Sequence, residues 1–429
     1  ETGREKAFLK LVDLSEKFMG DTFRKESYDA ARRMIQDPDS KWMQYVNRIL
    51  NEVDPHVIKM SALDYGFEAA FCGKKEINEM RVKHQCNIPW LILMDPTSAC
   101  NLHCTGCWAA EYGNRLNLSF EDMDRIVTQG KELGIYLYFF TGGEPLVRKD
   151  DIIRLCEKHK DVAFHAFTNG TLIDEEWAAF FGAHRPRRIN ITLYGASEKT
   201  YRELCRFEGY EKTVRAIKLL RAHGVDVKIN GSVVKENVHD MEAIYALGRS
   251  LDVPVHMDTY MLPGLHDRLQ PIEEQSRLLP EDAAWAELQT MKNEYPPEVF
   301  EEYRQRKCKE LQEPLSSPCN ISCMAAHCSF TVNWQGHMKP CVMQPEPAVS
   351  VFEHGFEAAW KQIVDGAKPL CFNEKCGSCA YRPVCKICVS AALLETGAYD
   401  GVPEYLCRQA KAYARLLEEE QDKNGSETK

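Results

Sequence analysis

The chain has 429 residues, of which 44% are hydrophobic and 28% are charged, as in globular proteins with several domains. Its formal net charge of −10 argues against a nucleic-acid-binding surface, because neutralising phosphates requires clustered Lys and Arg. No apolar run approaches the ~20 residues of a membrane span, and no secretory signal is visible, so we expect a cytoplasmic protein with no membrane partner. Its 18 cysteines lie largely at the spacings of metal ligands, which favours metal binding in a reducing compartment over disulfides.

Residues 1–86 are predicted to be helical. Apolar residues recur at steps of three and four over residues 7–12 and 43–50, which is the period of an amphipathic helix. Ser40 follows a break at Asp37-Pro38 and is a candidate N-cap for the second of these helices. We expect the region to pack over the following domain, and substrate or partner binding is the alternative.

Residues 87–265 alternate between strand-like and helix-like patterns. The predicted strands cover residues 88–94, 135–140, 162–167, 188–193, 226–234 and 253–258. A helix is predicted at residues 119–133, where Ser119 and Asp122 have the spacing of a capping box. Strands that alternate with helices form right-handed βαβ units and a parallel sheet, so six such units predict an incomplete barrel. Functional residues are then expected just past the carboxyl ends of the strands.

The loop after the first strand carries Cys100, Cys104 and Cys107 in the pattern C-x3-C-x2-C. Three thiolates on so short a loop cannot all pair as disulfides, but they can cap three irons of a four-iron cluster. The fourth iron would remain open, and an open coordination position makes a metal site reactive. A zinc site or three unrelated cysteines are the alternatives, although zinc prefers four ligands in paired C-x2-C knuckles.

A second group of ten cysteines follows a charged, proline-interrupted segment at residues 266–318, which is predicted to be a helical bridge. The ten are Cys319, Cys323, Cys328, Cys341, Cys371, Cys376, Cys379, Cys385, Cys388 and Cys407. A β-hairpin is predicted between them, with Gln335-Gly336 at its turn. Taken alone, the run C-x2-C-x5-C-x2-C that starts at Cys376 is also compatible with a pair of zinc knuckles. The cysteines outside both groups are predicted to be buried hydrophobes or bystanders: Cys72, Cys86, Cys156, Cys205 and Cys308.

Two motifs together resemble the radical S-adenosylmethionine (SAM) superfamily. The first is the cysteine loop followed by the aromatic Trp108, and the second is the run Thr141-Gly-Gly-Glu-Pro145 just after the second strand. In that family SAM chelates the open iron, and one electron from the cluster cleaves SAM to a 5′-deoxyadenosyl radical. The resemblance implies that the second motif holds the amino group of SAM, and the glycine pair permits a close backbone approach. The residues of this GGEP motif are Gly142, Gly143, Glu144 and Pro145.

The resemblance also implies SAM-binding roles for polar residues at later strand ends. Thr168 and Asn169 follow the third predicted strand and would line the SAM pocket. Thr192 and Arg206 resemble the residues that hold the ribose and the carboxylate of SAM, since a guanidinium can donate two parallel hydrogen bonds to a carboxylate. A purely structural role is equally open for this pair. Further along the chain a structural role is favoured for three polar residues that could reach the cavity: Asn230, Ser232 and Asp258.

The second cysteine group resembles the SPASM extension of radical SAM enzymes, which commonly holds two auxiliary four-iron clusters. The resemblance implies a first cluster on Cys319, Cys323, Cys341 and Cys388, and a second on Cys376, Cys379, Cys385 and Cys407. The sequence departs from the family pattern where two residues rather than three separate Cys385 from Cys388. Cys328 competes with Cys319 as a ligand, and Cys371 is a spare cysteine. The implied cofactors are SAM and three [4Fe-4S] clusters, one that binds SAM and two auxiliary, with a reducing partner such as flavodoxin or ferredoxin.

The predicted architecture is an α/β chain with a partial (β/α)6 TIM-like barrel at residues 87–265. An N-terminal helical segment at residues 1–86 precedes the barrel, and a C-terminal Cys-rich SPASM domain occupies residues 319–429. The implied activity is hydrogen abstraction from a peptide or protein substrate, which leads to crosslinking or side-chain oxidation.

Two alternatives to this activity stay open. One is a small-molecule substrate, such as a tetrapyrrole or a redox-cofactor precursor, and the other is a non-catalytic iron–sulfur or zinc scaffold. The sulfatase-maturating branch of the family has an Asp base directly after the cysteine that matches Cys341. Val342 occupies this position here, so that activity is not expected, and no residue is assigned as a catalytic acid or base.

Overall fold

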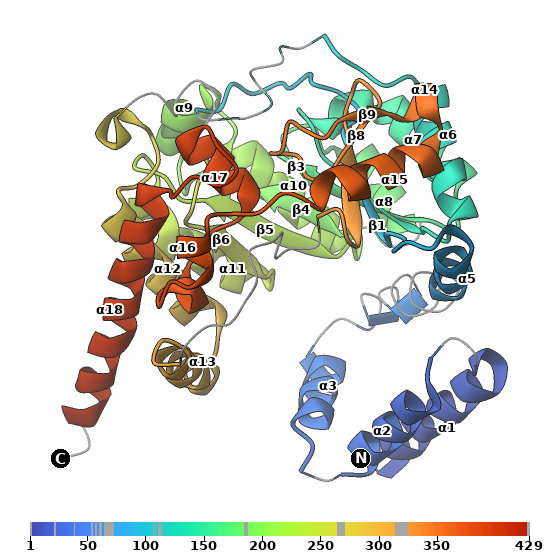
Figure 1. Cartoon of the computed structure of the whole chain (residues 1–429), viewed down its shortest axis with the longest axis horizontal. Helices are drawn as coiled ribbons and strands as arrows, with labels where there is room; N and C mark the ends of the chain where they lie inside the picture. The colour runs from blue at the N-terminus through green and yellow to red at the C-terminus, as the bar shows by residue number, and fades with distance from the viewer. Residues whose placement is uncertain are drawn as a thin grey trace.

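The computed structural model describes residues 2–426 except 21–22, 38, 53–54, 56–57, 60–61, 64–72, 106, 108, 110–112, 114, 184–187, 264–270 and 314–324. Its centre is a nine-stranded sheet in the order β6-β5-β4-β3-β2-β1-β7-β8-β9 (Figure 1). The strands are β1 (Leu91–Met94), β2 (Leu137–Phe140), β3 (Ala163–Thr168), β4 (Ile189–Thr192), β5 (Val227–Ser232), β6 (Val255–Asp258), β7 (Ser329–Val332), β8 (His337–Lys339) and β9 (Val349–Ser350). Strands β1 to β6 are parallel neighbours in chain order, and β6 is an edge of the sheet. The predicted partial barrel is therefore confirmed, and all six predicted strands are present.

Helices that follow the strands in sequence cover one face of this sheet. They are α6 (Phe120–Glu132), α7 (Lys149–Lys158), α8 (Glu175–Ala183), α10 (Tyr210–Ala222) and α11 (Met241–Leu251). Tyr138, Phe140 and Phe164 are buried under these helices, and the rings of Phe140 and Phe164 stack with centroids 5.3 Å apart. Each buried ring contributes about 1.5–3 kcal/mol through removal from water. Ser119 begins α6 with the predicted capping box, whose other member is Asp122.

Alternate residues of the same strands point to the opposite, inner face of the barrel. On β2 and β3 this face is aromatic, since the ring of Phe139 lies 4.7 Å from that of His165 and 5.8 Å from that of Phe167. On β4, β5 and β6 the corresponding positions are polar: Asn190, Thr192, Lys228, Asn230, Ser232, His256 and Asp258. The inner face is therefore divided into an aromatic half and a polar half.

The predicted hairpin is formed by β7 and β8, with Gly336 at φ +73° in its turn. The hairpin does not stand apart from the barrel, because β7 pairs in parallel with β1 over the register Leu91–Ser329 to Met94–Val332. This pairing was not predicted from the sequence. It joins the second cysteine group to the same sheet that carries the first.

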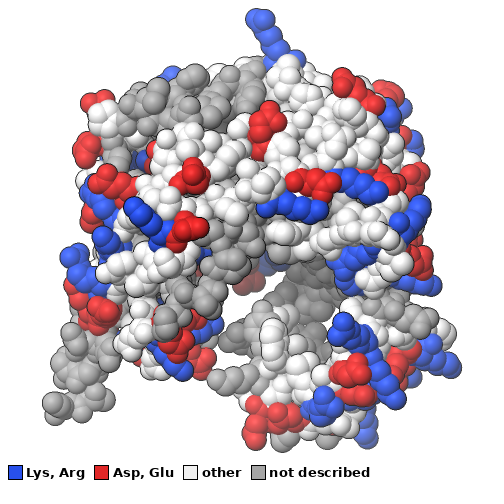
Figure 2. All heavy atoms as spheres, in the orientation of Figure 1, with Lys and Arg blue, Asp and Glu red and all other residues white. Residues whose placement is uncertain are grey.

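The remaining helices surround the sheet. They are α5 (Lys74–His84), α9 (Glu198–Cys205), α12 (Pro280–Glu294), α13 (Pro297–Glu310), α14 (Val351–His354), α15 (Phe356–Ala367), α16 (Glu374–Gly377), α17 (Val389–Thr396) and α18 (Glu404–Ser426), with short 3-10 helices η3 (Pro145–Arg148), η4 (Val238–Asp240), η6 (Ile272–Glu274) and η7 (Arg382–Val384). Helix α18 runs beside α12 along one side of the molecule (Figure 1). None of the helices in the described part of the chain is long and apolar enough to cross a membrane. Acidic and basic side chains are interspersed over the face seen in Figure 2.

The N-terminal helices are α1 (Thr2–Met19), α2 (Lys25–Gln36) and α3 (Lys41–Glu52). The predicted cap is present, since Ser40 Oγ accepts a hydrogen bond from the Met43 amide at 3.3 Å. These three helices lie below the barrel in Figure 1 and pack on one another rather than over the sheet. This arrangement differs from the expected packing over the following domain. Tyr28 and Ile35 of α2 are buried, whereas Leu11, Leu14 and Phe18 of α1 are exposed.

Candidate functional site

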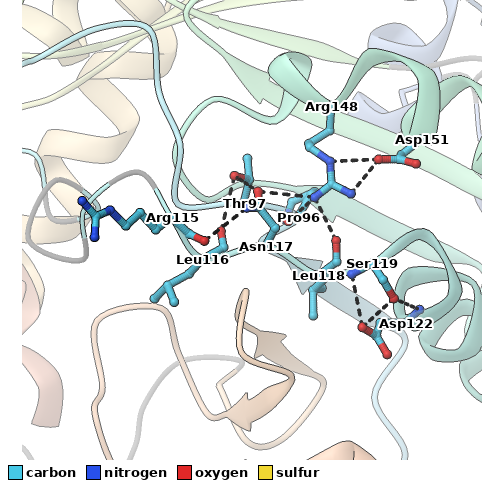
Figure 3. Close-up of polar contacts among 10 residues, drawn as sticks. All are labelled: Pro96, Thr97, Arg115, Leu116, Asn117, Leu118, Ser119, Asp122, Arg148 and Asp151. Atoms are coloured by element: carbon cyan, nitrogen blue, oxygen red, sulfur yellow. Dashed lines mark hydrogen bonds and ion pairs between the residues drawn. The ribbon is translucent and has the colours of Figure 1, made fainter.

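The cysteine loop is closed at its base by an antiparallel pairing of the chain on its two sides (Figure 3). The Ser98 amide donates to the Leu116 carbonyl at 2.8 Å, and the Leu118 amide donates to the Pro96 carbonyl at 3.0 Å. These bonds hold the two ends of the intervening loop together just past the carboxyl end of β1. All three predicted cluster cysteines lie on this loop.

Arg148 reinforces the base of the loop (Figure 3). Its Nη1 atom donates to the carbonyls of Pro96 at 3.2 Å and Leu118 at 2.8 Å, one on each side of the base. Asp151 accepts from Nε and Nη2 at 2.9 and 2.6 Å and fixes the guanidinium plane. Arg148 ends η3, which begins at Pro145 of the GGEP motif. Its planar guanidinium therefore links the motif to the cysteine loop through hydrogen bonds.

The glycine pair of the motif lies against the start of the cysteine loop. The Gly143 amide donates to the Thr97 carbonyl at 2.9 Å, and the Glu144 amide donates to the Ala99 carbonyl at 2.7 Å. A Cβ atom at Gly143 would lie 2.2 Å from the Ala99 oxygen, and one at Gly142, where φ is +104°, would lie 2.6 Å from the Thr97 oxygen. No side chain fits at these distances. The two motifs are therefore in direct backbone contact.

Glu144 joins the motif to the end of β3. Its side chain is 1% exposed, and Oε1 accepts from the Leu146 amide at 3.0 Å and from Thr168 Oγ1 at 2.7 Å. Oε2 accepts from the Asn169 amide at 2.8 Å. Burial raises the pKa of Glu144 to about 7, and these hydrogen bonds oppose that rise. The structure thus brings Glu144, Thr168 and Asn169 together, and much of the acceptor capacity of the carboxylate serves to position these loops.

Asn169 extends this network into the cysteine loop. Its Nδ2 atom donates to Asn101 Oδ1 at 2.9 Å, and Asn101 in turn donates to Thr171 Oγ1 at 2.8 Å. Asn101 directly follows Cys100, so the network reaches the first cysteine of the loop.

Helix α9 holds the far side of the loop. The amides of His103 and Thr105 donate to the carbonyls of Cys205 at 3.2 Å and Leu204 at 2.9 Å, in the last turn of this helix. Arg206 follows as the C-cap in the left-handed conformation, with φ +54°, and its side chain is exposed beside the loop. Thr192, the last residue of β4, is half-buried on the inner face of the barrel. The SAM-binding roles of both residues are implied only by the family resemblance and stay predictions.

Cys205 is completely buried, as predicted, but it is more than a core residue. Its thiol is hydrogen-bonded to the sulfur of Cys104, and this contact, assisted by Tyr194, lowers the pKa of Cys104. No spacing in the sequence relates Cys205 to the cysteine loop, because the contact arises from the docking of α9.

Asp95, the first residue after β1, is a buried carboxyl group that accepts a hydrogen bond from Thr141 Oγ1. Burial raises the pKa of Asp95 from 3.8 to about 7, and the nearby Lys339 opposes this rise. A carboxyl pKa that is higher in the folded state stabilises the fold at low pH, and this stability is lost as the pH rises to the folded pKa.

We therefore expect Asp95→Asn to become more stable relative to the wild type as the pH rises. The gain is expected to reach up to about 1.4 kcal/mol per pH unit between about pH 4 and 7, with no further gain above that range. The asparagine keeps an acceptor for Thr141, so the hydrogen bond is retained. Thermal unfolding of the cluster-free protein at acidic and neutral pH measures the difference, and a difference independent of pH would contradict a buried, protonated Asp95.

Residues 94–248 match the Radical SAM superfamily, a stretch that runs from the end of β1 into α11 and contains both motifs. The chain therefore contains a radical SAM domain over these residues. Among curated relatives, the AdoMet-dependent heme synthase of Methanosarcina barkeri is 26% identical over 332 residues, which cover 73% of this chain and 95% of that protein. The GTP 3′,8-cyclase of Caulobacter vibrioides is 31% identical over 170 residues, or 37% of this chain and 48% of that protein.

Two solved structures share the fold of this chain. Streptococcus suis SuiB bound to S-adenosylmethionine superposes with a TM-score of 0.58 at 16% identity, over 84% of this chain and 89% of SuiB. The structure of anSMEcpe with bound AdoMet and Cp18Cys peptide gives a TM-score of 0.61 at 19% identity, over 80% of this chain and all of that one. At these identities the likeness concerns the fold. It covers a larger part of the chain than the 94–248 match.

The radical SAM family uses a [4Fe-4S] cluster and SAM, and the cysteine loop fits such a cluster. The Leu102 amide donates a hydrogen bond to Cys100 Sγ at 3.4 Å, and the thiol of Cys205 donates one to the sulfur of Cys104. Hydrogen bonds to ligand sulfurs are a means by which proteins tune iron–sulfur clusters. In the described part of the chain no three Cys, His, Asp or Glu side chains converge as one metal ion would require. A cubane needs no such convergence, because each thiolate caps a different iron.

Four of the auxiliary cysteines gather in one place. They are Cys376 in α16, Cys379 just after it, Cys385 after η7, and Cys407 in α18. Burial raises the pKa of Cys385 to about 11, and the charges of Cys407 and Cys376 add to the rise. Burial likewise raises the pKa of Cys407, and the charge of Cys379 adds to this rise. These four residues are the set predicted for the second auxiliary cluster, and their role as its ligands stays a prediction.

The other auxiliary set is described only in part, since Cys319 and Cys323 lie outside the described residues, as does Trp108. Cys388 is the N-cap of α17, and its sulfur accepts from the Ala391 amide at 3.3 Å. The neighbouring Lys386 Nζ lies 3.0 Å from a carboxylate oxygen of Glu287 in α12. The loop of Cys388 is thereby anchored to a helix that packs on β6.

The spare cysteines have other surroundings. Cys328 precedes β7, at the end of the sheet opposite the cysteine loop, and its sulfur lies 3.7 Å from Asn87 Nδ2. Cys371 is exposed, and Cys156 is buried in the core. Whether Cys328 or Cys319 is a ligand therefore stays a prediction.

Proposed function

We propose that this radical SAM enzyme reductively cleaves SAM and abstracts a hydrogen atom from a carbon of a substrate held inside the barrel. The observation that carries the proposal is the direct contact of the cysteine loop with the GGEP motif, through the Gly143–Thr97 and Glu144–Ala99 hydrogen bonds. When bound, the cluster supplies the electron that converts SAM into methionine and a 5′-deoxyadenosyl radical. The chain itself orients the reactants: the GGEP backbone and Arg206 would hold the amino acid part of SAM, and Thr192 its ribose. Holding reactants in place supplies a large part of the rate in such reactions.

For the substrate we propose a peptide or protein. Support comes from the shared fold, since the structures of SuiB bound to precursor peptide SuiA and of anSMEcpe with Cp18Cys peptide both contain peptides. The auxiliary cysteines would take two further clusters, which suit electron transfer from the substrate when all four ligands of each are cysteine.

A small-molecule substrate is the second candidate. The observation in its favour is the match to AdoMet-dependent heme synthases, which extends over 95% of the Methanosarcina barkeri protein and 89% of the Nitratidesulfovibrio vulgaris protein. A peptide would extend farther out of the barrel than a compact small molecule would.

Anaerobic reconstitution with iron, sulfide, SAM and dithionite tests the proposed reaction. We expect 5′-deoxyadenosine from the wild type, none above background from Cys104→Ala, and wild-type levels from Cys371→Ala, whose thiol is exposed. Iron content is expected near roughly twelve per chain, as three four-iron clusters require. Absence of 5′-deoxyadenosine from an iron-loaded wild type would refute the enzymatic proposal, and stoichiometric zinc would refute the auxiliary clusters.

A further inference from the structure

The polar half of the inner barrel face contains a group of side chains with no assigned role. Asn190 on β4 is the register partner of Lys228 on β5, and Asn230 on β5 is the register partner of His256 on β6. Side chains at such paired positions lie about 5 Å apart at their Cβ atoms and point to the same face. The four residues Asn190, Lys228, Asn230 and His256 therefore form one patch, which we call the barrel floor.

Asn190 is the deepest member of the barrel floor. Its side chain is 5% exposed, and its Oδ1 atom accepts from Asn230 Nδ2 at 3.3 Å. Its Nδ2 atom is buried and has no hydrogen-bond partner in the described part of the chain. A buried amide donor without a partner costs about 1–3 kcal/mol, so a ligand that supplies an acceptor would recover this energy.

His256 presents a second donor to the same space. Its Nδ1 atom lies 2.9 Å from Glu294 Oε2, and Glu294 is itself held by Tyr245 Oη at 2.9 Å and by the Met257 amide at 3.1 Å. This bond to Glu294 raises the pKa of His256, and the weaker effects of Asp258 and Lys228 oppose each other. Nε2 lies 3.9 Å from Asp258 Oδ1, beyond hydrogen-bonding distance. The Nε2–H group thus remains available.

Lys228 adds a cation. Its side chain is half-buried on the inner face, and among the described residues it makes no hydrogen bond or ion pair. Three groups of the barrel floor are therefore donors without a hydrogen-bond partner in the described part of the chain: Asn190 Nδ2, Lys228 Nζ and His256 Nε2, the last of which lies 3.9 Å from Asp258 Oδ1. Asn190 is also the register partner of Phe167 on β3, so the barrel floor adjoins the aromatic half of the inner face.

We propose that the barrel floor binds a carboxylate of the substrate, with Lys228 and His256 as charged donors and Asn190 as the buried neutral donor. The inference deepens the proposed function, and it rests on the substrate entering this barrel. A carboxylate matches three donors because it offers only acceptor atoms, and its hydrogen bonds to charged donors are the strong ones. The aromatic half would then contact an apolar part of the same substrate. The carboxylate can belong to a small organic acid or to a peptide, for example a glutamate side chain.

Binding to the reconstituted, SAM-loaded protein without reductant tests the proposal, because it requires no turnover. The probes are two matched pairs, glutarate with its diamide and acetyl-Ala-Glu-Ala-amide with its glutamine counterpart, measured by titration calorimetry. We expect at least one acid to bind at least about tenfold more tightly than its amide, the difference of a charge-assisted hydrogen bond. Lys228→Met is expected to remove this preference, whereas Lys218→Met, an exposed lysine on α10, is expected to retain it.

If circular dichroism shows that Lys228→Met does not fold, the variant His256→Gln provides the test instead. Preference for glutarate alone would identify a small-acid substrate, and preference for the glutamate peptide alone would identify a peptide substrate; both outcomes support the carboxylate site. Equal binding of acids and amides, no binding of either acid, or an unchanged preference in folded Lys228→Met and His256→Gln would overturn it. Formation of 5′-deoxyadenosine by the wild type is measured separately, so failure of the carboxylate site and failure of SAM cleavage are distinguishable.

Discussion

Replacing Glu144 with alanine is expected to lower the rate of 5′-deoxyadenosine formation at least about 100-fold, because misplacement of reacting groups by about 1 Å costs that much. The substitution leaves the Leu146 amide, Thr168 Oγ1 and the Asn169 amide as buried donors without their acceptor. Their loss should also cost about 2–4 kcal/mol of unfolding free energy in the cluster-free protein. Single-turnover chemistry of the reconstituted protein and urea unfolding of the cluster-free protein measure the two effects.

Glu157→Ala is the matched control, since Glu157 lies on α7, a short distance along the chain, and is exposed. It should change neither quantity measurably. If Glu144→Ala retained wild-type cleavage, the hydrogen-bond network around Glu144 would have no part in positioning the cysteine loop and the GGEP motif.

The second large effect is expected at the buried ion pair between Arg277 and Glu395. The guanidinium donates to both carboxylate oxygens, at 2.5 and 2.9 Å, and the two side chains are only 5% and 7% exposed. Tyr260 Oη also donates to Glu395 at 2.9 Å, and the Arg277 guanidinium lies 4.0 Å from the centre of the Tyr405 ring. The pair thus connects the chain after β6 to α17 and α18, which carry auxiliary cysteines.

Glu395→Gln is expected to destabilise the protein by about 3–5 kcal/mol, because it leaves a buried guanidinium without its counter-charge. Replacing both partners with Met should cost much less than the single change, since no buried charge remains. The control is Glu281→Gln, which breaks the exposed 2.8 Å ion pair between α12 and Arg408 of α18 and should cost about 0–1 kcal/mol. Urea unfolding of the four proteins gives the comparison, and equal losses for Glu395→Gln and Glu281→Gln would show that the buried pair has no special role.

Much of the barrel could be predicted from the sequence, because its signals are local. Strand residues such as those of β2 and β3 are bounded by turn residues, and the helices between them follow the 3.6-residue period. The cysteine loop and the GGEP motif are each contained within a few consecutive residues, so their chemistry could be inferred before any contact between them was known. The antiparallel hairpin could be predicted for the same reason, from Gly336 in its turn.

Contacts between residues far apart in the chain could be found only in the tertiary structure. The pairing of β7 with β1, the fork of Arg148 across the base of the cysteine loop, and the approach of Cys205 to Cys104 leave no periodic signal. Arg277 and Glu395 are 118 residues apart, and each appears in the sequence as an ordinary charged residue. The sequence therefore determined the elements and the chemical groups of this protein. The tertiary structure decided which groups meet, because hydrogen bonds and burial depend on the packing of the elements and not on their order in the chain.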